Sequence, residues 1–463
     1  MHVAAVMVFE GSAPAYDDLL RHVETRLHLV PRYRQKLAFV PFGQGRPKWV
    51  DDPHFNLSYH VRHTALPRPG TDRELKRLAG RLFAQPLDRQ KPLWELWLVE
   101  GLDGGRFAIL SKTHHSLVDG ISGVDIASVL FDAAPDPDPP IDPPPAWVAQ
   151  PEPSASQLLA EALLERATVP AEAVRGLRAL TRAPRQAARR LAEGAAGIGS
   201  LAWTGVHPAP QSRFNVEIGP HRRYTWVDAD LARFKAIKNG LGGTLNDAVL
   251  STVTLALGAF LRRAGEDTDD LVLRAMVPVS VRVDDERGAL GNRVAAMYAP
   301  LHVGLTDPRA VFEAVHAEMG DLKQSGQAVG AQRLTEIADF APTTIMSQAA
   351  RVQARQRLFN LVVTNVPGPQ VPLYLLGRPM AGLYPVVPLA LRQALGIAIM
   401  SYHGRLGFGL MGDYDAMPDL EALAKDLERA VDALARAAGG NGRGPAGRRS
   451  TRPRARATIR AAT

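Results

Sequence analysis

Nine prolines fall within residues 135–153, and this run decides how the chain can be organised. A proline fixes its own φ and has no N–H to donate, so neither a helix nor a central strand continues through such a run. The length of 463 residues also favours two domains over one. We therefore expect an N-terminal lobe over residues 1–134, a proline-rich connector and basic linker over 135–213, and a C-terminal lobe over 214–437.

Most of the net charge of +8 comes from the C-terminal end of the chain. Residues 438–463 hold seven arginines and no acidic residue, so the remainder is close to neutral. We interpret 438–463 as a disordered Arg-rich tail. It contains no aromatic side chain to stack on bases, so we expect no nucleic-acid partner.

The linker contains a second basic pattern, made of five arginines at three- and four-residue steps (Arg175, Arg178, Arg182, Arg185 and Arg189). A helix would place them on one face, although Pro184 would break or kink it. A basic amphipathic segment of this kind lies on an anionic membrane surface or forms a solvated linker helix, and composition favours neither.

The chain has no cysteine, which excludes disulfides, thiolate metal sites and a cysteine nucleophile. Its first ten residues lack the basic start and long apolar core of a signal peptide. The best candidate for a membrane span, residues 248–261, is interrupted by Ser251, Thr252 and Thr254 and is shorter than the roughly 18 to 20 residues a span needs. We predict a buried helix there, and a cytoplasmic protein that contacts the inner face of the membrane peripherally.

Strand-like and helical patterns of apolar residues mix in both halves, which is typical of an α/β or α+β fold. An Asp-Gly turn over 102–105 joins two of the predicted strands as a hairpin. The final predicted helix takes Pro418 as its first residue and ends at Gly439-Gly440. Strands are predicted at 3–9, 93–101, 106–113, 224–227, 271–281, 293–303, 360–365, 380–386, 395–402 and 406–411, and helices at 17–27, 72–83, 230–238, 245–262, 308–323, 343–358 and 418–437.

Two adjacent histidines, His114 and His115, follow the predicted strand 106–113 and precede Asp119-Gly120. Catalytic groups often lie where a rigid strand ends and a turn begins. Histidine has an unperturbed pKa near neutrality and can accept a proton at physiological pH. A single histidine after a buried strand is more often a packed core residue, but the pair with its Asp-Gly favours a catalytic site.

The pattern His-His-x-x-x-Asp-Gly resembles the signature of the CoA-dependent acyltransferase superfamily, which includes chloramphenicol and carnitine acyltransferases and nonribosomal condensation domains. Within it, the chain is similar to the bacterial wax ester synthase/diacylglycerol acyltransferase family, because five further segments match that family in order and spacing. The resemblance covers residues 2–437 and implies two chloramphenicol-acetyltransferase-like lobes with the active site between them. The five segments are Pro92-Leu-Trp-Glu95, Asn246-Asp247-Ala-Val-Leu250, Pro278-Val-Ser-Val-Arg282, Gly291-Asn-Arg293 and Thr364-Asn-Val-Pro-Gly-Pro369.

The resemblance implies transfer of a long-chain acyl group from acyl-CoA, as co-substrate, to diacylglycerol or to a long-chain alcohol. The implied reaction requires no metal and no other cofactor. The resemblance also implies that the protein contacts a membrane or lipid-droplet surface. It assigns His115 as general base, His114 as a positioning or packing neighbour, and Asp119 as a structural residue that points toward an arginine. Asn246, from the second lobe, is implied as the oxyanion donor, and Asp247 as structural.

Local rules leave other roles open for several of these residues. Thr244 or Asn246 could equally serve as the N-cap of the helix that follows. Trp94 and Trp97 lie an odd number of positions apart, so on one strand they face opposite sides, and we expect both in the core. We assign no chemistry to residues 92–95.

Two other function classes stay open on the sequence. One is a condensation or polyketide-type acyltransferase that uses a carrier-protein thioester, although the chain shows no carrier domain. The other is an inactive protein that binds a lipid surface. Family members usually carry a short segment before the strand that opens here at Met1, so we expect a misassigned start site or a truncation.

Overall fold

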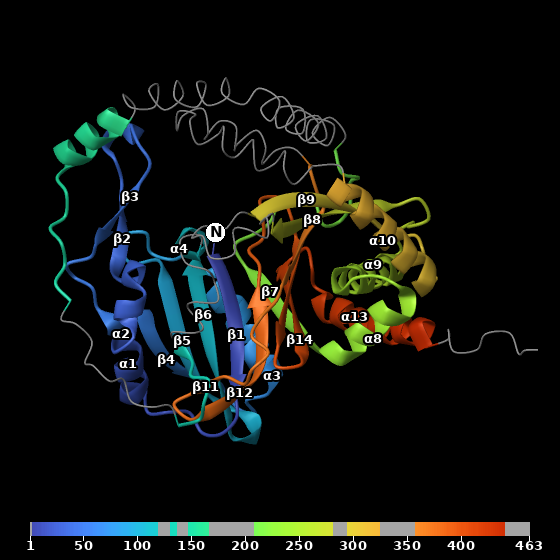
Figure 1. Ribbon diagram of the computed structural model, residues 1–463, viewed down its shortest axis with the longest axis horizontal. Helices are drawn as coiled ribbons and strands as arrows, with labels where there is room; N and C mark the ends of the chain where they lie inside the picture. Colours follow the sequence, from blue (N-terminus) through green and yellow to red (C-terminus); the bar gives the residue numbers. More distant parts are fainter. Residues whose placement is uncertain are drawn as a thin grey trace, which may run out of the picture.

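The computed structural model describes residues 2–118, 130–136, 147–165, 208–280, 294–324 and 357–439. Within them, two six-stranded sheets lie side by side and form the two lobes seen in Figure 1. A two-stranded ribbon, β2 (Gln35–Ala38) and β3 (Lys48–Asp51), extends from the first lobe. The predicted mixture of strands and helices in two lobes is therefore confirmed.

The first sheet has the order β11-β12-β1-β6-β5-β4. Its centre is antiparallel, and β4 runs parallel to β5. The predicted hairpin over 93–113 is present as β5 and β6, joined by a short 3₁₀ turn at Asp103–Gly105. The strands are β1 (His2–Phe9), β4 (Val61–Ala65), β5 (Trp94–Leu102), β6 (Arg106–His114), β11 (Tyr374–Leu375) and β12 (Arg378–Val386).

The second sheet has the order β7-β14-β13-β10-β8-β9, with β10 parallel to both of its neighbours. Helices α8, α9, α10 and α13 pack on it and share one large apolar core, on the side away from the first lobe in Figure 1. The strands are β7 (Arg222–Asp230), β8 (Val272–Ser280), β9 (Val294–His302), β10 (Leu361–Val366), β13 (Leu395–Tyr402) and β14 (Arg405–Asp413). The helices are α8 (Leu231–Leu241), α9 (Leu245–Arg263), α10 (Pro308–Gln324) and α13 (Leu420–Gly439).

The expected position of α9 is confirmed, and its central residues are buried, so the apolar run 248–261 is a core helix. Among the described residues, no single helix is long and apolar enough to cross a membrane. Helices α8 and α9 would pass such a test only together, and they meet at a bend of 97°.

The last helix begins later than the sequence pattern predicts. Its first residue is Leu420, because the Asp419 carbonyl accepts the N–H groups of Ala422 and Leu423 and so acts as the cap. Pro418 therefore lies outside the first turn, not at its first position. Most of the predicted helix 343–358 lies outside the described residues.

A crossover that the sequence did not predict joins the two lobes. Strands β11 and β12 come late in the chain, yet β12 pairs antiparallel with β1, from Ala4 opposite Val386 to Phe9 opposite Met380. Gly409 of β14 lies against this crossover strand, where a Cβ would be 1.7 Å from the Pro385 carbonyl oxygen. The first sheet is thus completed by residues from the second half of the chain.

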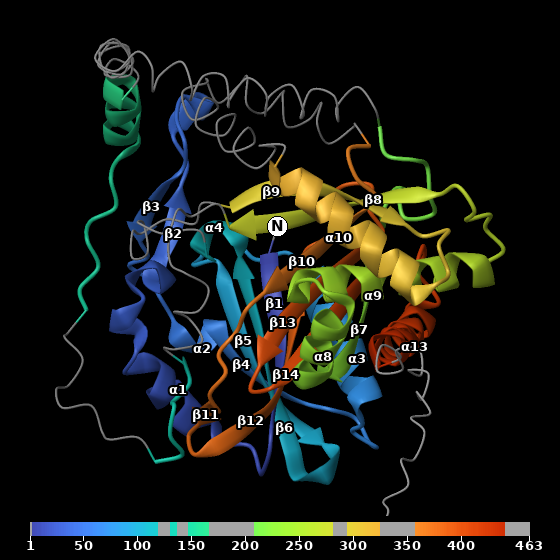
Figure 2. The ribbon, with the colours of Figure 1, turned by 45° about the vertical axis from the view of Figure 1, so that its right-hand side comes forward.

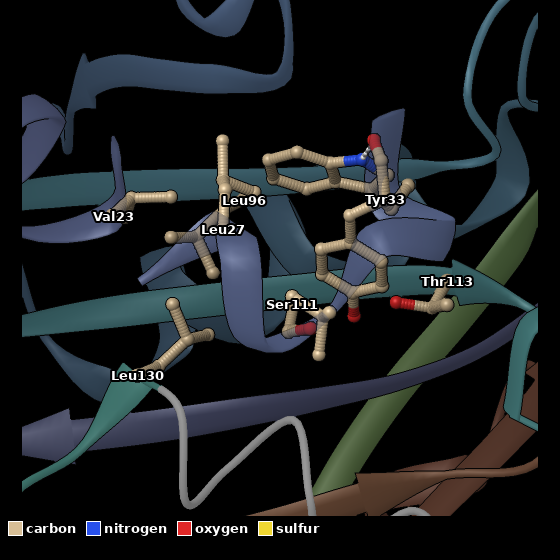
Figure 3. Close-up of a pocket in the computed structure, with 9 residues that line it drawn as sticks. Val23, Leu27, Tyr33, Leu96, Ser111, Thr113 and Leu130 are labelled. Carbon is tan, nitrogen blue, oxygen red and sulfur yellow. Dashed lines mark hydrogen bonds between the residues drawn. The ribbon is translucent and has the colours of Figure 1, made fainter. Parts of the chain in front are cut away.

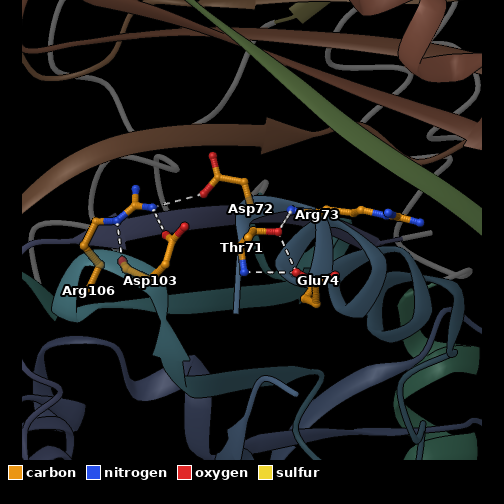
Figure 4. A network of polar contacts seen from close by, with 6 residues as sticks. All are labelled: Thr71, Asp72, Arg73, Glu74, Asp103 and Arg106. Carbon is orange, nitrogen blue, oxygen red and sulfur yellow. Dashed lines mark hydrogen bonds and ion pairs between the residues drawn. The ribbon is translucent and has the colours of Figure 1, made fainter. Parts of the chain in front are cut away.

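Helix α3 (Asp72–Ala84) lies between the first sheet and β7 of the second lobe. Its start is fixed by a capping box, in which Thr71 accepts from the Arg73 N–H and the Glu74 carboxylate accepts from the Thr71 N–H (Figure 4). Arg106 at the start of β6 bridges Asp72 and Asp103 beside this cap. The helix therefore has a fixed start between the lobes.

Helix α3 also packs directly on the backbone of β7. A Cβ at Gly80 would lie 2.9 Å from the Arg222 carbonyl oxygen, so only glycine permits this spacing. Phe83 packs edge-on against Tyr224, and the apolar cluster here combines residues of α3, β1 and β7. This cluster is the core between the lobes.

This packing predicts opposite effects for one substitution at two helical glycines. Gly80→Ala should lower the free energy of unfolding by about 1 to 3 kcal/mol, since the methyl group overpacks the α3–β7 contact. Gly320→Ala in α10, where a Cβ meets nothing within 4 Å, should raise it by roughly 0.5 to 1 kcal/mol. Denaturant unfolding of both variants measures the difference, and equal effects would contradict the proposed spacing.

Candidate active site

The two histidines lie at the end of a central strand of the first sheet. His114 is the last residue of β6, and His115 opens the short helix α4 (His115–Val118). The N–H of His114 donates to the carbonyl oxygen of Leu93, the residue before β5, at 2.9 Å. His114 is half-buried and His115 is exposed, so His115 is the member of the pair that a substrate can reach.

The ring of His114 is engaged within its own turn. Its Nδ1 accepts the backbone N–H of Ser116 at 3.3 Å, and the Ser116 hydroxyl lies 2.8 Å from the same nitrogen. Burial lowers the pKa of His114, and the amino terminus, Arg89 and His115 lower it too. A neutral ring held in this way suits a positioning or packing role.

A third histidine, which sequence analysis missed, faces this pair. His2 of β1 lies directly opposite His114 in the antiparallel register, so their side chains share one face of the sheet. Its Nε2 donates to the Phe83 carbonyl oxygen at 2.6 Å. The pKa of His2 is lowered to about 4, chiefly by burial, with Lys112 and His114 also lowering it and the hydrogen bond to Phe83 raising it. Only the pairing of β1 with β6, which the sequence does not reveal, makes His2 a neighbour.

Residues 92–95, to which the sequence assigns no chemistry, form the wall beside the histidines. Trp94 is buried, stacks on Tyr33 and on His60 at 4.7 Å, and donates its Nε1–H to the Tyr33 carbonyl oxygen at 2.8 Å. Glu95, on the opposite face, forms an ion pair with Lys112 at 3.2 Å. Trp97 packs against the interlobe core, so the predicted opposite orientation of the two tryptophans is confirmed.

A small apolar pocket lies beneath the end of β6 (Figure 3). Tyr33 points toward Thr113, which immediately precedes the histidine pair. The cavity volume is about 10 Å³, roughly the space of one water molecule. As it stands the pocket cannot hold an acyl chain. Its lining is Val23, Leu27, Val30, Tyr33, Trp94, Leu96, Ser111, Thr113 and Leu130.

In the second lobe, Asn246 lies in the first turn of α9. The N-cap is Thr244, whose hydroxyl accepts the Asp247 N–H at 3.2 Å, so the capping role that local rules left open belongs to Thr244. The Asn246 Oδ1 instead accepts a hydrogen bond from Asn365 Nδ2 at 3.4 Å. The structure therefore brings together the Asn-Asp segment and the Thr364–Pro369 segment.

Asp247 serves the same helix start as a structural group. It is buried, and its Oδ2 accepts the Thr244 N–H at 2.8 Å and lies 2.8 Å from His316 Nδ1 on α10. This arrangement fixes the first turn of α9 and hence the backbone of Asn246.

Several candidate residues lie outside the described residues: Asp119 and Gly120, Val281 and Arg282, and residues 291–293. Figures 1 and 2 show one end of the paired strands β8 and β9 on the side of the first lobe where α4 lies. Within the described part of the chain, no group of three or more His, Asp or Glu side chains could hold a metal ion.

The arrangement offers groups that can transfer a proton and donate a hydrogen bond. An accessible imidazole can accept the proton of an alcohol, and a side-chain amide can donate to an oxyanion. The nearby Lys112 and Glu95 are buried as an ion pair, whereas the His115 side chain is exposed.

Comparison with known proteins covers nearly the whole chain. The family model for the wax ester synthase/diacylglycerol acyltransferase catalytic domain matches residues 1–249, and the model for the C-terminal domain of that family matches residues 290–435. The probable diacylglycerol O-acyltransferase tgs1 of Mycobacterium tuberculosis is 34% identical over 93% of this chain and 90% of its own length. The probable diacylglycerol O-acyltransferase tgs2 of the same species is 35% identical over 95% of each.

Solved structures show the same architecture. The wax ester synthase/diacylglycerol acyltransferase of Marinobacter aquaeolei VT8 superposes with a TM-score of 0.65 at 28% identity, covering 95% of both chains. The first condensation domain of the CDA synthetase superposes with a TM-score of 0.54 at 17% identity, over 94% of this chain and 90% of that one. The second likeness concerns the fold alone.

The depressed pKa of His2 predicts a pH dependence of stability. The unfolded chain binds a proton at His2 below about pH 6.5, whereas the folded protein does so only near pH 4, so stability falls as pH drops from 6.5 toward 4. His2→Gln, which does not titrate, should reduce that loss. Urea unfolding at pH 7.5, 5.5 and 4.5 measures it, with exposed His54→Gln as control. Equal slopes in the wild type and His2→Gln would contradict the assignment.

Proposed function

Since the chain belongs to the wax ester synthase/diacylglycerol acyltransferase family and is an acyltransferase of lipid metabolism, we propose that it transfers a long-chain acyl group from acyl-CoA to diacylglycerol, and also to long-chain alcohols. Two observations support the proposal: His115 is exposed directly after the last residue of central strand β6, and Asn246 in the first turn of α9 contacts Asn365. The mycobacterial relatives support diacylglycerol as the acceptor.

In the proposed mechanism His115 acts as general base. It accepts the proton of the acceptor hydroxyl while the hydroxyl oxygen attacks the thioester carbonyl carbon, which forms a tetrahedral intermediate. When the carbon–sulfur bond breaks, the protonated His115 returns that proton to the CoA sulfur. The products are an ester and free CoA, and His115 is neutral again.

Asn246 is the proposed donor to the oxyanion of this intermediate. Its Oδ1 accepts from Asn365, so its Nδ2 is turned to donate elsewhere. Thr244 and Asp247 hold the helix start, which keeps the amide oriented before the reaction begins. Asp119 is proposed as a structural residue of the motif and His114 as a positioning residue.

The substrates are lipids, so the enzyme must work at a lipid surface. We propose a cytoplasmic protein that meets its acceptor at a membrane or lipid droplet, with the arginines of residues 175–189 as the contact. The condensation-domain likeness shares only the fold, so it gives no support to a carrier-protein thioester as donor.

The choice of acceptor is tested with purified protein and radiolabelled palmitoyl-CoA. Dioleoylglycerol should yield labelled triacylglycerol and stoichiometric CoA, and hexadecanol should yield labelled wax ester at a lower rate. Release of neither lipid product from either acceptor would overturn the proposed function.

His115→Ala should abolish transfer while the protein keeps its fold. Loss of a positioned general base typically costs about 10²- to 10⁴-fold in rate. Circular dichroism and the unfolding midpoint provide the folding check, and His54→Ala is the matched control on an exposed histidine outside the site. Normal turnover by His115→Ala would remove this residue from the mechanism.

Asn246→Ala should lower kcat by about 10²- to 10³-fold with little change in the KM for acyl-CoA, because the oxyanion exists only near the transition state. Thr244→Ala removes the cap instead, so it should cost about 1 kcal/mol of stability and reduce kcat less. Steady-state kinetics and denaturant unfolding separate the two effects. A loss of kcat with Thr244→Ala equal to that with Asn246→Ala would argue against an oxyanion role.

A further inference from the structure

A buried lysine lies two residues before the histidine pair. Lys112 of β6 is only 1% exposed, yet lysine is rarely buried unless its charge is paired. Its side chain shares a face of the sheet with His114, because residues two apart on a strand point the same way. A buried ammonium at this place requires an explanation that the chemistry of acyl transfer does not supply.

The ammonium of Lys112 binds the end of helix α3. Its Nζ donates to the carbonyl oxygens of Leu82 and Gln85, both at 3.1 Å. These carbonyls belong to the last turn and C-cap of α3, where the helix dipole is negative, and the Leu82 carbonyl also accepts the Gln85 N–H. His2 binds the Phe83 carbonyl between them, so β1 and β6 together satisfy the end of the helix.

The positive charge of Lys112 is balanced from the neighbouring strand. Glu95 lies directly opposite Lys112 in the β5–β6 register, is 7% exposed, and places Oε2 3.2 Å from Nζ. The same carboxylate accepts the Trp97 Nε1–H at 3.2 Å and pairs with Arg62 at 3.4 Å. Burial lowers the pKa of Lys112 while Glu95 raises it.

These contacts form one connected path between the lobes. Lys112 fixes the end of β6 to α3, and α3 packs at Gly80 on the backbone of β7 in the second lobe. His115 directly follows β6, at the first-lobe end of this path. In the proposed function it must meet acyl-CoA, the acceptor and groups of the second lobe at once. Small errors in such an alignment are costly, since a displacement of about 1 Å can reduce a rate by about 100-fold.

We propose that Lys112 is a positioning residue: by binding the C-terminal carbonyls of α3 and the carboxylate of Glu95, it fixes the end of β6, and with it the histidine pair, relative to the second lobe. The expected effect of Lys112 on kcat rests on the proposed function. Its expected effect on the order of α3 and β6 does not. This placement of Lys112 also gives residues 92–95 a role, because Glu95 holds the lysine and Leu93 accepts the N–H of His114.

The structural consequence is tested by amide hydrogen exchange, without any substrate. Lys112→Met keeps the aliphatic stem but removes the donors, so exchange should become faster in the last turn of α3 and at the end of β6, while α9 and α13 stay unchanged. Lys235→Met, at an exposed lysine on α8, is the matched control and should change neither region. Unchanged exchange in Lys112→Met would overturn the proposal whatever the activity.

The kinetic consequence is a split between kcat and KM. Lys112→Met should lower kcat by up to about 100-fold and leave the KM for acyl-CoA within about twofold, since misalignment affects the transition state more than binding. Glu95→Gln keeps the bonds to α3 and should show the same pattern to a smaller degree. If both variants keep the wild-type kcat, Lys112 does not position the site.

Chemical rescue separates positioning from a general loss of stability. The chain has no cysteine, so Lys112→Cys introduces a single thiol. Alkylation of the unfolded variant with 2-bromoethylamine, followed by refolding, restores a side chain of lysine length that ends in an ammonium group. It should recover kcat and slow exchange at the end of α3, whereas the neutral iodoacetamide adduct should recover neither. Equal recovery by both adducts would overturn the proposal.

A wild type that transfers an acyl group to no acceptor would overturn the proposed function alone, because the hydrogen-exchange measurements do not depend on activity.

Discussion

The three carbonyl oxygens at the end of α3 are the constraint on which the site depends. The last turn of a helix leaves carbonyl oxygens without helical donors, and two of the three residues here, Leu82 and Phe83, are buried. Here the donors are Lys112 and His2, from the two strands that carry or face the histidine pair. The need to satisfy a helix terminus and the need to place a catalytic strand are met by the same two side chains.

The second lobe reaches its half of the site by a different physical route. In this lobe the fixed element is the start of α9. Thr244 and Asp247 form a capping box there, and His316 of α10 contacts the Asp247 carboxylate. Asn246 is left to contact Asn365 at the end of β10. In the proposed site, each lobe contributes one group from the terminus of an element, His115 after β6 and Asn246 in the first turn of α9, so the site can be rigid before a substrate arrives.

Periodicity and turn chemistry predicted the mixed fold and most of the elements, because local signals such as the Asp-Gly turn and the burial of residues 248–261 act within a few residues. The motif segments predicted the family. Three things depended on contacts distant in sequence: the β1–β12 pairing, the place of His2 opposite His114, and the ion pair between Glu95 and Lys112. The choice of Thr244 over Asn246 as cap is local, because Thr244 and Asp247 close a capping box. The late start of α13 was missed for a local reason, since Asp419 was available as a cap and Pro418 was given the wrong position.

The crossover has a consequence for how the protein is made. Strand β1 gains one neighbour when β6 is complete at His114, but its other neighbour, β12, begins only at Arg378. At the usual translation rate of about 5 to 20 residues per second, the interval is on the order of tens of seconds. During that time the nascent first sheet has an open edge of unpaired N–H and C=O groups, which is a template for wrong pairing with other chains. The edge stays open until β12 is made, whatever the stability of the finished fold.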